Sequence, residues 1–289
     1  MTELLPPLSS LTLFPSRSMS YNAGVLVYGR DALLIDPGLF PDEIDRLRSH
    51  IYAHGASPTY LVVTHNHWDH VLGPEYFPGV PVVQLQESQA VLAESGARIE
   101  RQVTEWERQS GVQRDMPFLL REPDQTFADQ LELRLGDRTI ELLHAPGHAP
   151  EQLVVYDQSE TTLWAADMLS DIEIPFVMHS LEAYRQTLDR LAQLDVTTLV
   201  PGHGTPASGR SEVRARFDTD RAYLAELQRR VEAAVAAGRR ISDALRDCAG
   251  MTYADRDQNK EAHRLNIETA FIELGGQADA KHPGWNRFQ

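Results

Sequence analysis

The chain has 289 residues, of which 42% are hydrophobic and 24% charged, the balance of an ordinary globular protein. Its formal net charge of −15 argues against a nucleic acid as the default partner, because nucleic-acid affinity depends largely on neutralising phosphates. The single cysteine, Cys248, excludes an internal disulfide and a thiolate-rich metal site.

The N-terminal segment Met1–Pro7 has no basic start followed by an apolar run, so we expect no signal peptide. No uninterrupted apolar stretch approaches the roughly 20 residues that a membrane-spanning helix needs. We therefore expect a cytoplasmic protein that does not enter the membrane.

Apolar runs and turn residues predict a chain of strands with interspersed helices as far as Pro206, and helices alone after it. The region after Pro206 is expected to form helices at 211–237, 241–248 and 261–274, ended by glycines at Gly238 and Gly275. Groups of strands punctuated by helices predict an α+β fold in which two sheets share a core and helices lie outside. The expected strands are 11–14, 21–28, 32–35, 60–63, 80–83, 131–135, 138–143, 152–156, 161–166 and 198–200, and the expected earlier helices are 42–54, 86–111 and 181–194.

Four potential metal ligands follow one buried strand. His65, His67, Asp69 and His70 lie within six residues, directly after the apolar run 60–63. Neutral imidazole and carboxylate are ligands that Zn²⁺ and related divalent metals prefer. A polar turn or satisfied core histidines would explain a single histidine, but they explain three histidines and an aspartate this close together poorly. The motif therefore predicts a metal site.

Three further candidate ligands lie in comparable places along the chain. His148, Asp167 and His203 each follow an apolar strand, and proline or glycine shapes the loops of the two histidines. A single histidine in a glycine turn is weak evidence for a ligand. Because the same arrangement recurs after four strands, a shared sheet end would bring seven ligands together.

These residues resemble the complete motif set of the metallo-β-lactamase-fold metallohydrolases. The resemblance covers roughly residues 20–206, and Asp36 in Leu34–Gly38 is similar to an early aspartate of that superfamily. It implies a four-layer αββα sandwich of two mixed sheets. It also implies a catalytic domain at 1–208 and a helical C-terminal extension at 209–289, which resembles the tails of glyoxalase II and of a lactamase-β-like endoribonuclease.

The resemblance also assigns roles to the ligands. It implies two divalent metals, zinc first, with iron or manganese as alternatives, that share a hydroxide nucleophile. Asp69 is also a candidate to accept a proton as the intermediate collapses, and Asp36 either orients a ligating imidazole or caps the turn before Gly38. One metal would be held by His65, His67 and His148, the second by Asp69, His70 and His203, and Asp167 would bridge both.

The position of Asp167 bears on the substrate. The β-lactamase branches of the superfamily have cysteine or serine there, so the resemblance favours hydrolysis of a carboxylic ester, thioester or lactone. The apolar stretch Ile172–Met178 would wall a small-molecule pocket through Phe176, or it packs as plain core. His179 either faces the metals or caps the helix predicted at 181–194. The island Met116–Leu120 would be a lid or a contact in a homodimer.

Two other classes of function are weighed against this one. A phosphodiesterase or endoribonuclease of the same fold is suggested by arginines between Arg210 and Arg230, but acidic residues alternate with them, which favours a solvated, ion-paired helix face. A non-catalytic sensor would be expected to lack a ligand, and here the set is complete. We therefore expect a small-molecule substrate as the partner.

Overall fold

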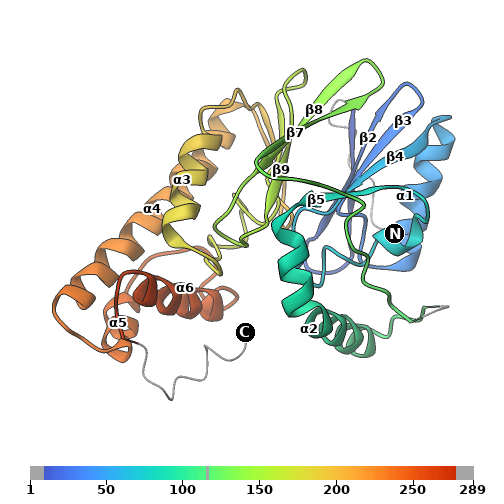
Figure 1. The fold of residues 1–289 in the computed structure, drawn as a ribbon. Helices are drawn as coiled ribbons and strands as arrows, with labels where there is room; N and C mark the ends of the chain where they lie inside the picture. The colour runs from blue at the N-terminus through green and yellow to red at the C-terminus, as the bar shows by residue number, and fades with distance from the viewer. Residues whose placement is uncertain (1–9, 115–116, 278–289) are drawn as a thin grey trace. The chain divides into compact units, whose positions relative to one another are not determined.

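A mixed six-stranded sheet forms the first half of the fold in the computed structural model, which describes residues 10–114 and 117–277 (Figure 1). Its order is β1-β2-β3-β4-β5-β6, antiparallel as far as β3 and parallel from β3 to β6. Its strands are β1 (Leu11–Pro15), β2 (Asn22–Tyr28), β3 (Asp31–Ile35), β4 (Ser57–Val62), β5 (Val82–Leu85) and β6 (Gln125–Phe127).

Two helices connect the parallel strands of this sheet. Parallel neighbours cannot be joined by a tight hairpin, so the chain crosses over through α1 (Pro41–Ala53) between β3 and β4. The helix α2 (Glu87–Ser110) crosses over between β5 and β6. Ile44, Leu47 and Ile51 of α1 recur at helical spacing and are fully buried in the core. The apolar run of β3 is buried, and so are Leu61 and Val62 at the end of β4, as expected for parallel strands covered on both faces.

The second sheet has the order β12-β11-β10-β9-β8-β7. The run from β7 to β10 pairs antiparallel throughout, as do β11 and β12. Short turns join β7 to β8 and β9 to β10, which antiparallel neighbours allow. Its strands are β7 (Gln130–Leu135), β8 (Arg138–His144), β9 (Leu153–Asp157), β10 (Thr162–Trp164), β11 (Thr198–Val200) and β12 (Ala207–Ser208).

Four helices lie in the described C-terminal part of the chain, three of them after the last strand. They are α3 (Leu181–Leu191), α4 (Arg210–Ala236), α5 (Ile241–Cys248) and α6 (Lys260–Glu273), and the last three pack on one another. The buried stripe of α4 recurs every three or four residues and includes Phe217, Leu224 and Leu227. By compactness the chain forms two units, Met1–His144 with Glu151–Ala166, and Ala145–Pro150 with Asp167–Gln289.

These elements confirm the predicted α+β fold with two sheets and C-terminal helices. The sequence predicted neither β6 nor β12, and the two-residue strand β12 follows Pro206, where only helices were expected. Several predicted ends are displaced by two or three residues. The domain boundary at 208/209 stays a prediction. Among the described residues, no helix has both the length and the hydropathy that a membrane span requires.

The apolar island at 116–120 is described only from Pro117 onward, so Met116 lies outside the described residues. Phe118 and Leu120 pack against the core of the first unit, and Leu119 is 65% exposed. The alternatives of a lid and a dimer contact stay open.

Candidate metal centre

The histidine motif forms a loop directly after β4, and buried polar contacts fix its backbone. Glu151 Oε1 accepts hydrogen bonds from the backbone N and from Nδ2 of Asn66, at 2.9 and 3.2 Å. Asn66 Oδ1 accepts from Gln84 of β5 at 2.9 Å, and the backbone N of Leu153 donates to Thr64 O at 2.9 Å. The loop therefore rests on strands of both sheets within the first unit.

Asp36 lies at the centre of the polar contacts beneath this loop. Its side chain is fully buried, and its φ of +45° is one that aspartate tolerates better than most residues. Oδ1 accepts from the backbone N of Thr64 at 2.8 Å, and Oδ2 accepts from Thr64 Oγ1 at 2.7 Å. Asp36 Oδ2 also lies 3.1 Å from Nδ1 of His70, placed to accept its N–H.

The same carboxylate orients His65 through Thr64. The threonine hydroxyl has one proton, which it donates to Asp36, so it accepts from Nδ1 of His65 at 3.1 Å. Both rings then turn Nε2 toward other candidate ligands. His65 Nε2 lies 3.0 Å from His67 Nδ1, and His70 Nε2 lies 3.7 Å from Asp69 Oδ2.

In the second unit, the two oxygens of Asp167 face two different imidazoles. Oδ2 lies 3.4 Å from Nε2 of His148, and Oδ1 lies 3.8 Å from Nε2 of His203. Nδ1 of His148 donates to the backbone carbonyl of Phe176 at 2.8 Å, which directs Nε2 toward Asp167. The carboxylate of Asp167 therefore lies near two of the predicted histidine ligands.

Glycines allow the backbone to pass closely around both histidines of the second unit. Gly147, before His148, has a φ of +142°, and a Cβ there would lie 2.4 Å from Cα of Tyr184. Gly204, after His203, has a φ of +111°, and a Cβ there would lie 2.2 Å from the carboxylate of Asp171. The glycines beside these ligands are therefore required by space and by backbone conformation.

The loops that carry Asp167 and His203 are tied together by polar contacts. Ser170 Oγ donates to the carbonyl of His203 at 2.7 Å, and Asp171 Oδ1 accepts from the backbone N of Thr205 at 2.8 Å. These bonds connect residues three and four positions after Asp167 to residues at and just after His203. The spacing of the two ligands is therefore held by the loops themselves.

Side chains of helix α4 form hydrogen bonds with the loop that carries Asp167, at the backbone of Leu169, whose φ is +60°. Arg216 donates to the carbonyl of Leu169 at 3.0 Å and to that of Thr205 at 3.1 Å. One turn later, Asp220 Oδ2 accepts from the backbone N of Leu169 at 3.2 Å. The sequence analysis did not single out Arg216 or Asp220 for this role, although Asp220 occupies a position of the otherwise apolar stripe of α4.

Burial raises the pKa of Asp220 to about 8, although the Leu169 N–H and the charge of Arg216 both act to lower it. A carboxyl whose folded pKa exceeds its unfolded value holds its proton more tightly in the folded state. The contribution of the Asp220 carboxyl to the free energy of unfolding is therefore fully present below its ordinary pKa of 3.8. This contribution is lost as the pH rises toward 8.

Replacing Asp220 with asparagine, which cannot ionise, is expected to remove this pH dependence. As the pH rises from about 5 to about 8, the wild type should lose stability relative to the variant. The difference between their free energies of unfolding should change by up to about 4 kcal/mol, because each pH unit contributes roughly 1.4 kcal/mol. Urea unfolding at four pH values in this range measures the difference. Parallel profiles for the two proteins would contradict a raised pKa at Asp220.

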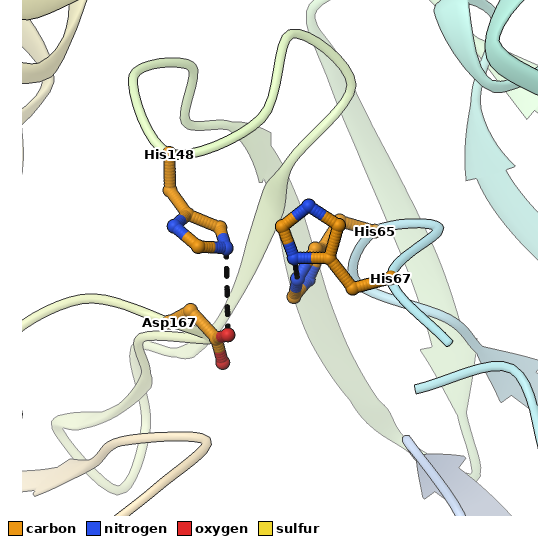
Figure 2. A group of neighbouring side chains, drawn as sticks. All are labelled: His65, His67, His148 and Asp167. Atoms are coloured by element: carbon orange, nitrogen blue, oxygen red, sulfur yellow. Dashed lines mark hydrogen bonds and ion pairs between the residues drawn. The ribbon is translucent and has the colours of Figure 1, made fainter. Parts of the chain in front are cut away.

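All seven predicted ligands fall into two groups. Within each group, the donor atoms lie within 4.8 Å of one another. Figure 2 shows one group, His65, His67, His148 and Asp167, with its imidazole nitrogens and carboxylate gathered together. The other consists of Asp69, His70 and His203. The donors are buried except for the half-buried His67 and Asp167, and imidazole and carboxylate donors without thiolates fit a borderline divalent metal. Which residue binds which metal stays a prediction.

The predicted pocket residues lie beside these ligands in the second unit. Phe176 is half-buried, with its ring centroid 5.8 Å from that of His148. His179 is exposed, and its backbone N donates to the carbonyl of Gly147 at 3.2 Å. Ser180, and not His179, caps α3, because its hydroxyl accepts from the backbone N of Ala183.

The family of the chain is shown by its sequence. The sequence model of the metallo-beta-lactamase superfamily matches residues 18–203. A linear primary-alkylsulfatase of Pseudomonas sp. is 30% identical over 99 residues, which is 32% of this chain and 19% of that protein. An acyl-coenzyme A thioesterase of Gallus gallus is 26% identical over 159 residues, 52% of this chain and 57% of that protein. The chain thus matches only part of the length of these relatives.

A solved structure has the same fold. The crystal structure of a metallo-beta-lactamase family protein from Thermus thermophilus superposes with a TM-score of 0.64, covers 92% of each chain and is 21% identical. With the sequence match across residues 18–203 and the two groups of histidine and aspartate donors, the chain belongs to the metallo-beta-lactamase superfamily.

Proposed function

We propose that the chain is a two-metal hydrolase that cleaves a carboxylic ester, a thioester or a lactone. The observation that carries the proposal is the arrangement of Asp167, whose two oxygens face His148 and His203 at 3.4 and 3.8 Å. A carboxylate placed in this way is suited to join two metal sites, and the other donors complete one group around each.

Bound divalent metals would lower the pKa of a water molecule and polarise the scissile carbonyl. Other residues of the chain orient the imidazoles so that their Nε2 atoms could bind metal. Asp36 orients His70 directly and His65 through Thr64, and the carbonyl of Phe176 orients His148. Asp69, 6% exposed, is the candidate to receive the proton when the leaving group departs.

Two features support a carbonyl substrate of small size. Aspartate at position 167 replaces the cysteine or serine expected of the β-lactamase branches, and the half-buried ring of Phe176 places an apolar surface beside His148. The thioesterase among the relatives supports thioesters within this class. The alkylsulfatase among them makes a sulfate ester the competing substrate to test.

A substrate panel with zinc-loaded protein tests the proposal. We expect release of thiol or acid from an acyl-coenzyme A, a lactone or an aryl ester, abolished by a chelator and restored by zinc. Alkyl sulfate and bis(aryl) phosphate serve as the comparison arms. Protein that holds two metal equivalents but turns over none of the three carbonyl substrates would contradict the proposal, and turnover of the alkyl sulfate alone would assign a sulfatase.

The arginines of α4 do not support a nuclease. Arg210, Arg221 and Arg230 form ion pairs with acidic side chains at 2.6–2.8 Å, so their charges are already matched. A groove that binds nucleic acid needs cations that can neutralise phosphates.

A further inference from the structure

The C-terminal helix α6 presents three polar side chains to the backbone that follows the Asp167 loop. Asn259 directly precedes the first residue of the helix, and Asn266 and Glu273 follow at intervals of seven residues. Seven residues make about two turns, so the three side chains share one face. All three make hydrogen bonds to main-chain atoms between Ile172 and Glu182.

The two asparagines pair with this backbone as a neighbouring strand would. Asn259 accepts from the backbone N of Ile174 at 3.2 Å and donates to Ile172 O at 2.9 Å. Asn266 accepts from the backbone N of Val177 at 2.7 Å and donates to Pro175 O at 2.6 Å. Both asparagines are buried, so each pair of bonds satisfies backbone groups away from water.

The amide of Asn266 is itself held in place. Its Nδ2 also donates to the hydroxyl of Tyr223 on α4 at 2.9 Å, and that hydroxyl lies 2.9 Å from Nδ1 of His263. The other nitrogen of His263 donates to the carbonyl of Cys248 at 3.2 Å. Donors and acceptor of the amide are thus all used, which fixes its orientation.

The carbonyl between the two bonds of Asn266 points to a metal-ligand candidate. Asn266 binds Pro175 O and Val177 N, the backbone groups on either side of residue 176, so the backbone is held both before and after Phe176. The backbone N of Met178 also donates to Phe176 O, at 3.1 Å. Phe176 O accepts from Nδ1 of His148 at 2.8 Å, and Nε2 of the same ring lies 3.4 Å from Asp167.

We infer that Asn266 is a positioning residue for His148. It fixes the Phe176 carbonyl, and that carbonyl fixes the tautomer and the direction of the imidazole. Asn259 holds the start of the same segment. The C-terminal helices would thereby set the affinity of one metal without touching it. This inference rests on the proposed metal centre.

The test compares two variants of the full chain that remove contacts from the same helix face. Asn266→Ala removes the contacts to Pro175 and Val177, whereas Glu273→Ala removes those to Ser180, Leu181 and Glu182. Competition with a chromophoric chelator measures both zinc equivalents. We expect Asn266→Ala to weaken one equivalent by roughly ten- to a hundredfold. Glu273→Ala should lower the melting temperature and leave both zinc affinities unchanged.

A second readout follows the imidazole itself. Long-range proton–nitrogen NMR of the zinc-loaded protein should show the Nδ1-protonated tautomer of His148 in the wild type and its loss or broadening in Asn266→Ala. If Asn266→Ala does not fold, Tyr223→Phe removes one bond to the same amide, and a smaller change of the same sign is expected. Unchanged zinc affinity and an unchanged His148 signal, or equal zinc weakening in both variants, would overturn the inference.

Failure of the proposed metal centre would look different. Wild-type protein that binds fewer than two zinc equivalents would contradict the centre. In that case, the NMR signal of His148 in metal-free wild type and metal-free Asn266→Ala would still show whether Asn266 orients the His148 imidazole.

Discussion

Asp167→Asn is expected to lower kcat/KM by roughly a hundred- to a thousandfold and to reduce the bound metal from two equivalents to one. Asparagine keeps one oxygen toward one imidazole but turns an NH₂ group, which cannot bind a metal, toward the other. The wild-type carboxylate instead directs one oxygen to His148 and one to His203. Elemental analysis and steady-state kinetics on the same preparation measure both effects.

Asp195→Asn is the matched control for this experiment. Asp195 is an exposed aspartate of the same unit, ion-paired with Arg210, and its replacement should change neither metal content nor rate. If Asp167→Asn retains two equivalents of metal and normal turnover, Asp167 does not bridge the centre and the proposed mechanism is wrong.

Asp36→Asn is expected to weaken metal binding by roughly ten- to a hundredfold while the fold is kept. Asparagine tolerates the φ of +45°, so the backbone is not strained by the change. If its oxygen stays with the backbone N of Thr64, its NH₂ group faces two other donors, the hydroxyl of Thr64 and Nδ1 of His70. The unmatched buried donors should also lower the free energy of unfolding by about 1–3 kcal/mol.

Chelator competition and denaturant unfolding of the metal-free protein separate these two effects. Asp31→Asn is a suitable control, because Asp31 lies at the other end of β3 and accepts from Thr59 and Gly136. A variant at position 36 that is less stable but binds metal as the wild type does would limit Asp36 to the alternative role of capping its turn.

The positions of the metal-ligand candidates could be predicted from the sequence because each follows an apolar run. The strands β4 and β11 are short and end in buried apolar residues, and a ligand candidate follows the last strand residue after three positions in both cases. Local sequence is enough to show this pattern. By contrast, β6 has three residues, two of them exposed, and carries no periodicity that could be detected.

The residues that orient the ligands were harder to predict for two physical reasons. Phe176 orients His148 through a backbone carbonyl, which leaves no trace in residue type. Asp220 and Asn266 are polar residues at core positions of their helices, and their partners lie 51 and 89 residues away in the sequence. Such residues can be recognised in a sequence as polar residues at helical spacing within an apolar stripe. On α4, Asp220 lies in this way between Phe217 and Leu224.

Anomalous X-ray diffraction from crystals of the zinc-loaded protein tests the central claim most directly. We predict two anomalous peaks, one against His65, His67 and His148, the other against Asp69, His70 and His203, with Asp167 in contact with both. A single peak, or two peaks of which neither touches Asp167, would contradict the two-metal centre.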